Sequence, residues 1–379
     1  MYDPSEIRRI ALSSGYEVWA NRYEYLGIYK SDKLCGGGIH ASHMQYINEM
    51  SASGLSGIIK AKYLVTSLCN QSCYYCYNGK ENSATELNAD DAKKIIDKLR
   101  DEGIVLLQFH GGEPSVRKDF PELLKTADRN GMLVWFFTNG SVPVWNKDGI
   151  YECISSMKTS PHITVSVLSA KEEEHDCLSG HRGAYKQLIS TVERLRGLKC
   201  NVTLSTSLNQ KTYGGLKEVE GLAKALDCKV QIITEVFSCV GNSEKNSNLH
   251  LNDEQINYAR ESILKSKKIL LNEDECATGK GSITIDESGN LIGCERSRKL
   301  VYGNVLKDRL TDIINSIKFQ NDIRTFFSKP KECKECDKNL KIFCKWCASI
   351  PANHGIEQNK WREYHCDMAR KRRLFWFGE

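Results

Sequence analysis

Three cysteines, Cys69, Cys73 and Cys76, fall within the stretch "CNQSCYYC" at 69–76, with the spacing C-x₃-C-x₂-C. Thiolates bind soft metals, and each cysteine ligand of a four-iron cluster takes a different iron. Three ligands would leave the fourth iron open for a small molecule. A zinc ion is the alternative, but a zinc site normally has four protein ligands. No Cys or His follows Cys76 within thirty residues.

The stretch "GGEP" at 111–114 is the second group of residues with a chemical meaning. Gly111 and Gly112 allow the backbone to approach a ligand closely, and the Glu113 carboxylate can accept hydrogen bonds from an ammonium group. Taken alone, the stretch is equally typical of a turn. Its position directly after an apolar, strand-like run favours a binding function.

The chain has 379 residues, of which 16 are cysteines, and they cluster at 69–76, 276–294 and 333–366. The N-terminus lacks the apolar run of a secretory signal, so metal ligation explains the clusters better than disulfides do. The remaining cysteines are scattered singly, and we predict that they are small buried hydrophobic residues. These are Cys35, Cys153, Cys177, Cys200, Cys228 and Cys239.

Apolar runs that alternate with amphipathic stretches must position these groups. The predicted strands are 61–66, 104–109, 133–138, 163–168, 202–208 and 230–234. The predicted helices between them include 91–103, 120–131, 184–197 and 216–227. Such alternation predicts an α/β fold with a parallel sheet and right-handed crossovers. Six units predict a partial (β/α)₆ TIM-like barrel, with the three cysteines at its C-terminal face.

Four segments are predicted along the chain. Residues 1–57 form an N-terminal extension with an aromatic-rich stretch that suits short strands, and this extension is a candidate substrate-recognition element. The partial barrel covers 58–238, and a polar linker with a bridging helix near 253–267 covers 239–268. The cysteine-rich segment is 269–379, in which 281–294 reads as a β-hairpin. The basic run 370–373 reads as a solvated helix end.

Together, these motifs resemble the radical S-adenosylmethionine (SAM) superfamily over the barrel segment. The resemblance implies that Cys69, Cys73 and Cys76 hold a [4Fe–4S] cluster whose open iron takes the amino and carboxylate groups of SAM. Leu168 and Ser169 stand where the family often has Asp-Gly. The other SAM-binding residues that the resemblance implies are Tyr75 near the adenine, Gly111, Gly112 and Glu113 at the amine, Thr138 and Asn139 at the same face, Ser166 at the ribose and Arg182 at the carboxylate.

The C-terminal cysteines resemble the SPASM domain, which binds two auxiliary [4Fe–4S] clusters in peptide-modifying members of the superfamily. The resemblance assigns Cys276, Cys294 and Cys347 to the first auxiliary cluster. The second would take Cys333, Cys336, Cys344 and Cys366. The spacing x₂, x₇, x₂ differs from the family's usual x₂, x₅, x₃, so the pairing stays open, and a zinc ribbon is the alternative. We also hypothesise that the first auxiliary cluster keeps an open iron.

The resemblance implies a radical SAM oxidoreductase that uses a 5′-deoxyadenosyl radical to modify a ribosomally synthesised peptide by C–C or thioether cross-linking. A peptide or sugar epimerase is the alternative enzyme, with Cys153, Cys177 or Cys239 as candidate hydrogen donors. A non-enzymatic metal-binding scaffold is the alternative from another class. No catalytic residue can be named from the sequence.

The expected partners are the peptide, an electron donor such as flavodoxin or ferredoxin, and a separate leader-binding protein if the extension does not bind the leader. The net charge of +5 is too small to indicate nucleic-acid binding. The sequence contains no apolar run of about 18 residues, so no membrane span is predicted. A cytoplasmic location is expected.

Overall fold

The computed structural model describes residues 7–22, 25–35, 45–46, 49–50, 56–78, 86–234, 236–237, 239, 246–262, 276–330, 332–333, 336, 343–344, 346–353 and 356–378. The glycine-rich turn predicted after Cys35 lies outside these residues, as does the end of the bridging helix beyond 262. Among the described residues, no helix is both long and apolar enough to cross a membrane.

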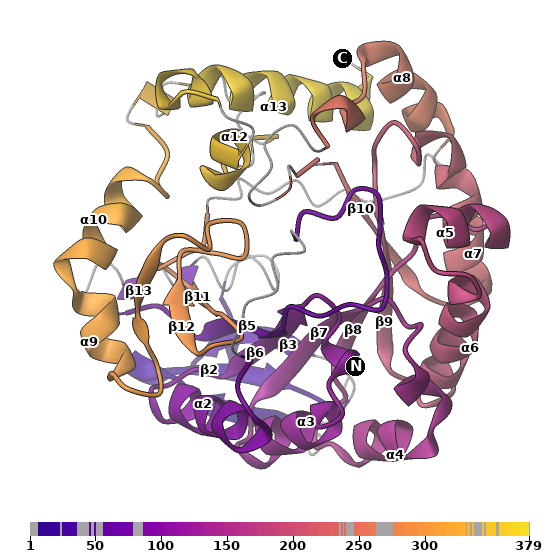
Figure 1. The fold of residues 1–379 in the computed structure, drawn as a ribbon. Coiled ribbons are helices and arrows are strands. Elements are labelled where there is room, and N and C mark those ends of the chain that lie inside the picture. The colour runs from indigo at the N-terminus through magenta and orange to yellow at the C-terminus, as the bar shows by residue number, and fades with distance from the viewer. Residues whose placement is uncertain are drawn as a thin grey trace.

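A nine-stranded sheet in the order β10-β9-β8-β7-β6-β5-β11-β12-β13 forms the centre of the molecule (Figure 1). Its first six strands are parallel and follow the chain in order from β5 to β10. They are β5 (Lys60–Thr66), β6 (Leu106–Gly111), β7 (Leu133–Thr138), β8 (His162–Ser166), β9 (Asn201–Ser207) and β10 (Lys229–Ile233). The predicted α/β fold with a six-unit partial barrel is confirmed.

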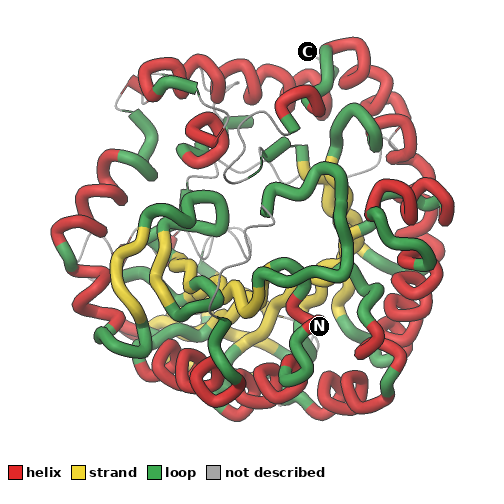
Figure 2. The backbone as a smooth tube through the Cα atoms, viewed as in Figure 1, coloured by secondary structure: helices red, strands yellow, loops and turns green. Residues whose placement is uncertain are grey.

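Helices form an outer ring around the arc of strands (Figure 2). Alternate strand residues, such as Tyr63 and Phe109, are buried in the main hydrophobic core together with the apolar faces of these helices. The residues between them, such as Lys62 and His110, therefore face the interior of the barrel. The helices are α2 (Ala89–Asp101), α3 (Phe120–Arg129), α4 (Asp148–Ser156), α5 (Glu172–Ser179), α6 (Ala184–Gly197) and α7 (Leu216–Ala225).

The N-terminal segment forms a separate antiparallel sheet with the order β1-β2-β3-β4. Its apolar residues pack against Ile59, Val105 and Leu133, at the N-terminal ends of β5, β6 and β7. The predicted short strands are confirmed, and the sheet covers the end of the barrel opposite the cysteine triad. A role in substrate recognition stays a prediction. The strands are β1 (Arg8–Ala11), β2 (Tyr16–Ala20), β3 (Tyr25–Lys30) and β4 (Lys33–Leu34).

The cysteine-rich segment begins with the predicted hairpin, formed by β11 (Ser282–Ile285) and β12 (Asn290–Ile292). Strand β11 pairs in parallel with β5, so the hairpin extends the barrel sheet instead of standing apart from it. The sequence did not predict this pairing. The remaining elements are β13 (Val301–Asn304), α8 (Asp253–Ser262), α9 (Leu310–Asn315), α10 (Ile317–Thr325), α12 (Ser349–Asn353) and α13 (Trp361–Phe377).

Two predictions about exposure are corrected by the structure. Cys177 is exposed on α5 instead of buried, and Cys228 is only partly buried. In the basic run, Arg372 is buried and donates to the carbonyl of Phe343 at 2.8 Å. Arg370 pairs with Asp253 of α8 at 3.0 Å. The run therefore fastens α13 to its neighbours, and it is only partly the solvated helix end that was predicted.

Candidate cofactor and cluster sites

The loop that carries the first three cysteines leaves the C-terminal end of β5 and reaches the end of α5. The backbone N–H of Ser72 donates to Ser179 O at 2.9 Å, and the N–H of Tyr74 donates to Leu178 O at 3.3 Å. The Asn70 side chain donates to Ser141 Oγ at 3.1 Å, beyond the end of β7. Contacts with segments that follow β7 and β8 therefore hold the triad at the C-terminal face, where it was predicted.

The three thiols are close enough for their charges to interact. Burial is the main cause that raises the pKa of Cys69 to about 11 and of Cys73 to about 12, and the neighbouring thiols contribute to both shifts. Among the described residues, no three acidic, His or Cys side chains are arranged as ligands of one metal ion. A four-iron cluster takes each cysteine on a different iron, so its ligands stand further apart. The donor set fits such a cluster.

Gly111 and Gly112 lie where the C-terminal ends of β5 and β6 meet. Gly111 has a φ of +152°, and a Cβ atom there would lie 2.3 Å from Thr66 O. A Cβ atom on Gly112 would lie 2.2 Å from Leu68 O. The N–H of Gly112 donates to Thr66 O at 2.9 Å. Both glycines are therefore needed to pack this turn against the cysteine loop, and their contact with SAM stays a prediction.

Glu113 is buried beside the triad. Its Oε1 accepts from the N–H of Ser115 at 3.0 Å and the hydroxyl of Thr138 at 2.8 Å, and its Oε2 accepts from the N–H of Asn139 at 2.6 Å. Burial raises the pKa of Glu113 against the effect of these hydrogen bonds. The Asn139 side-chain amide in turn lies 3.8 Å from Cys69 Sγ. The carboxylate thus organises the polypeptide around the triad, and its contact with the SAM ammonium stays a prediction.

We expect Glu113→Gln to weaken SAM binding roughly tenfold, because a carboxamide nitrogen would replace an acceptor and leave a buried donor unpaired, at a cost of about 1–3 kcal/mol. Calorimetric titration of SAM into the cluster-loaded protein measures the change. Glu122→Gln, at an exposed position of α3, is the matched control. An affinity equal to that of the unchanged protein would contradict the role given to Glu113.

The remaining predicted SAM contacts lie at different depths. Thr138 and Asn139 are buried next to Glu113, and Ser166 ends β8. Tyr75 is partly buried, and its carbonyl accepts from the Asn246 side chain at 2.9 Å. Arg182 is exposed in the turn between α5 and α6. The structure thus gathers Thr138 and Asn139 at the triad and leaves Arg182 at the surface. The contacts of all five residues with SAM stay predictions.

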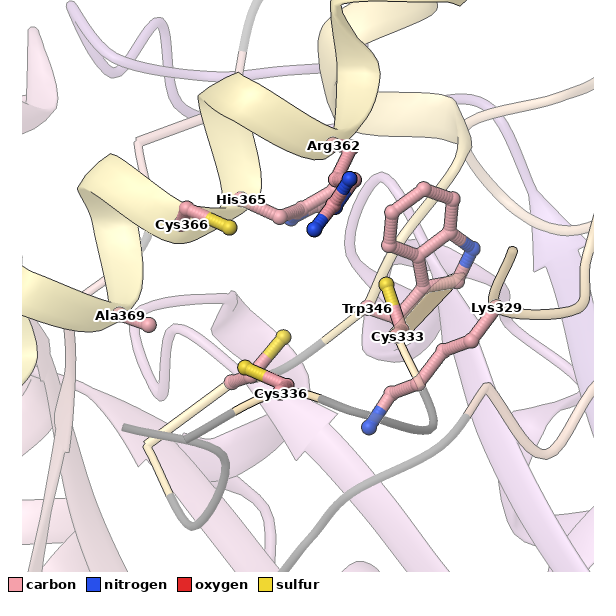
Figure 3. Close-up of a pocket in the computed structure, with 9 residues that line it drawn as sticks. Lys329, Cys333, Cys336, Trp346, Arg362, His365, Cys366 and Ala369 are labelled. Atoms are coloured by element: carbon pink, nitrogen blue, oxygen red, sulfur yellow. The ribbon is translucent and has the colours of Figure 1, made fainter. Parts of the chain in front are cut away.

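Four C-terminal cysteines line one cavity, which Lys329, Trp346, Arg362 and His365 help to enclose (Figure 3). Cys366 comes from α13, and Cys333 and Cys336 come from the chain that precedes this helix. The Cys344 thiol interacts electrostatically with those of Cys333 and Cys366. The second auxiliary set predicted from the resemblance is therefore assembled in space, and the four cysteines that line this cavity are Cys333, Cys336, Cys344 and Cys366.

The three cysteines assigned to the first auxiliary set also come together. The Cys347 thiol interacts with those of Cys276 and Cys294, and burial is the main cause that raises the Cys347 pKa to about 12. Ser349 Oγ lies 3.2 Å from Cys294 Sγ. The structure therefore separates the ten cysteines into the three groups that were predicted. The ligation of iron by these thiols stays a prediction, as does the open iron of the first auxiliary cluster.

A charged group that the sequence did not predict lies between the triad and the first auxiliary set. Lys62 of β5 pairs with the buried Glu295 at 2.9 Å, and Arg296 lies 3.7 Å from the same carboxylate. The Arg296 guanidinium covers the rings of Phe237 at 3.6 Å and Tyr77 at 5.5 Å. The only sequence signal for this group was the position of Glu295 and Arg296 directly after Cys294.

Two family models match the chain. The model described as the radical SAM superfamily covers residues 63–219, and the SPASM model, described as an iron-sulfur cluster-binding domain, covers 276–337. The second match includes the hairpin and Cys276, Cys294, Cys333 and Cys336. The predicted cofactors, SAM and [4Fe–4S] clusters, are confirmed at the level of the two domains.

Curated relatives and a solved structure agree with these matches. The PqqA peptide cyclase of Bradyrhizobium diazoefficiens is 27% identical over 43% of this chain and 42% of its own length, so the match spans less than half of that relative. The subtilosin biosynthesis protein AlbA of Bacillus subtilis is 22% identical over 83% of this chain and 72% of its own. Streptococcus suis SuiB bound to S-adenosylmethionine has a TM-score of 0.61 over 80% of this chain and 76% of its own, and at 15% identity this likeness shows the fold alone.

Proposed function

Because the chain belongs to the radical SAM superfamily and carries a SPASM domain, we propose that it cross-links a ribosomally synthesised peptide through an oxidative C–C or thioether bond. The observation that carries this proposal is the division of ten cysteines into three groups: the triad at the C-terminal face of the barrel and the two auxiliary sets. SAM on the reduced triad cluster supplies a carbon radical able to abstract hydrogen from an unactivated C–H bond. The peptide as substrate is supported by one relative that is named a PqqA peptide cyclase and by another that is named for the biosynthesis of the bacteriocin subtilosin.

The auxiliary cysteine sets favour cross-linking over epimerisation. A cross-link removes two hydrogen atoms from the peptide: one is abstracted, and the other leaves as a proton and an electron that needs an acceptor. Cys276, Cys294 and Cys347, next to the barrel interior, offer a site for that acceptor. An epimerase needs instead a thiol that returns a hydrogen atom. Cys153 is unsuited to this role because it lies on the buried face of α4, where its thiol donates to Pro121 O at 3.5 Å.

The proposal includes partners and a location. The triad cluster must be reduced before each turnover, which a flavodoxin- or ferredoxin-type donor would do. The N-terminal sheet packs on the end of the barrel opposite the triad. If this sheet does not bind the leader, a separate leader-binding protein would present the peptide at the C-terminal face. A reducing compartment keeps the ten grouped cysteines available as cluster ligands, which supports a cytoplasmic location.

Anaerobic reconstitution followed by peptide mass spectrometry tests the proposal. We expect roughly 12 irons per chain from three four-iron clusters and cleavage of SAM on reduction. A peptide encoded beside the gene should lose two mass units when it is incubated with the enzyme, SAM and reductant. Unchanged mass in ordinary water, with deuterium incorporated from heavy water, would indicate the epimerase instead. Tightly bound zinc without SAM cleavage would refute both enzymatic functions, cross-linking and epimerisation, and would indicate a metal-binding scaffold.

A further inference from the structure

We propose that Arg296 is a positioning residue that raises the reduction potential of the first auxiliary cluster and connects this site to the cysteine loop of the SAM site. The inference rests on the cluster content included in the proposed function. It does not depend on the peptide, because the potential can be measured without substrate.

The first observation is the position of Arg296 beside two thiols of the auxiliary set. Its backbone N–H donates to Cys294 Sγ at 3.4 Å. Its side chain interacts electrostatically with Cys294 and Cys347. Hydrogen bonds to ligand sulfurs and nearby positive charge both favour the reduced form of a cluster, which carries one more negative charge. Arg296 supplies both effects from one residue.

The second observation is an excess of positive charge inside the protein. Lys62 and Arg296 share one carboxylate, that of the buried Glu295. Lys62 holds it at 2.9 Å, and Arg296 is more distant at 3.7 Å. Two cations and one anion leave one positive charge, and a buried charge is costly without compensation. The thiolates of the neighbouring cluster provide the missing negative charge.

The third observation is that the guanidinium is fixed in place and retains an unused donor. Its plane covers Phe237 at 3.6 Å, and the Asn353 side chain donates to the Arg296 carbonyl at 2.8 Å. Its Nε is buried and has no hydrogen-bond partner within the described part of the chain. The guanidinium also lies 5.5 Å from the ring of Tyr77, which packs edge-on against Phe237 and directly follows Cys76. One side chain therefore contacts the surroundings of both cluster sites.

The test is a potentiometric titration of the reconstituted enzyme followed by electron paramagnetic resonance, with no peptide present. For Arg296→Met we expect the ratio of reduced to oxidised first auxiliary cluster, at a fixed potential, to fall roughly tenfold. Arg296→Lys should restore most of the ratio, because the positive charge is kept. The signal of the first auxiliary cluster is identified as the one that Cys276→Ala removes.

Arg362→Met is the matched control, because Arg362 lies beside Cys333 and Cys366 of the second auxiliary set. It should change the potential of the second cluster alone.

An unchanged first-cluster potential in Arg296→Met, or an equal shift in Arg296→Lys, would overturn the proposal. If Arg296→Met loses about four irons, Arg296→Gln is titrated in its place. Loss of the cluster in both neutral variants would assign Arg296 a structural role and equally overturn the proposal. If the unchanged protein holds three clusters and the peptide is not modified, only the proposed function fails.

Discussion

Cys73→Ser protein is expected to cleave no SAM and to hold about eight irons instead of about 12. Cys73 is the central residue of the triad, and its thiol interacts with those of both Cys69 and Cys76. A serine hydroxyl does not ionise at neutral pH and is a harder, weaker ligand for iron. Iron analysis and the release of 5′-deoxyadenosine after reduction with dithionite measure the two effects.

Cys177→Ser is the matched control, because Cys177 is exposed on α5, whose end contacts the triad loop. It should retain full iron content and SAM cleavage. If Cys73→Ser cleaved SAM at the normal rate, the triad would not be the SAM site. If both variants lost activity equally, the loss would not be specific to cluster ligation.

The second large effect is expected for Gly112→Ala, which should reduce SAM cleavage at least about 100-fold and lower the melting temperature by about 5 °C. The added Cβ would lie 2.2 Å from Leu68 O and 2.7 Å from Ser67 O. Both atoms belong to the backbone, so no side-chain rotation relieves the contact. The segment that leads into Cys69 must move, and the triad moves with it. SAM turnover and differential scanning fluorimetry measure the effect.

Gly149→Ala is the control for the added methyl group. Gly149 lies in α4, and a Cβ atom there would meet nothing within 4 Å. Alanine is favoured over glycine in helices by about 1 kcal/mol, so this variant should be slightly more stable and fully active. A Gly112→Ala protein with normal turnover would mean that the turn after β6 does not need to approach the cysteine loop.

The barrel elements were predictable because each buries one face. Strand β7 was predicted at its observed bounds from the apolar run 133–138, and α6 likewise from its period. Helices α4 and α5 were not predicted. The sequence of α5 is EEEHDCLS, whose three acidic residues give it no clear apolar stripe. It is held instead by its contacts with α6 and the triad loop, which a local pattern does not contain.

The candidate site was predictable where the signal was local. Cysteine spacing and the turn at 111–114 indicated the triad, and the resemblance to the SPASM domain implied the two auxiliary sets. The structure groups these thiols accordingly. The pairing of Lys62 with Glu295 depends instead on the pairing of β11 with β5 and of β12 with β11, because Glu295 follows β12. These pairings join segments far apart in the chain. The burial of Arg372 depends in the same way on the fold around Phe343. Neither contact leaves a trace in the sequence near these residues.

The pairing of β5 with β11 also has a consequence for synthesis of the chain. Strand β5 leaves the ribosome early, and β6 can join it soon afterwards, but its other neighbour is made only when 282–285 has been translated. Until then one edge of β5 has unpaired backbone N–H and C=O groups, and an open apolar edge of this kind is prone to pair with other chains. The last step of barrel folding therefore waits for the C-terminal segment. A nascent chain that stalls before β11 is expected to depend on chaperones to stay free of aggregates.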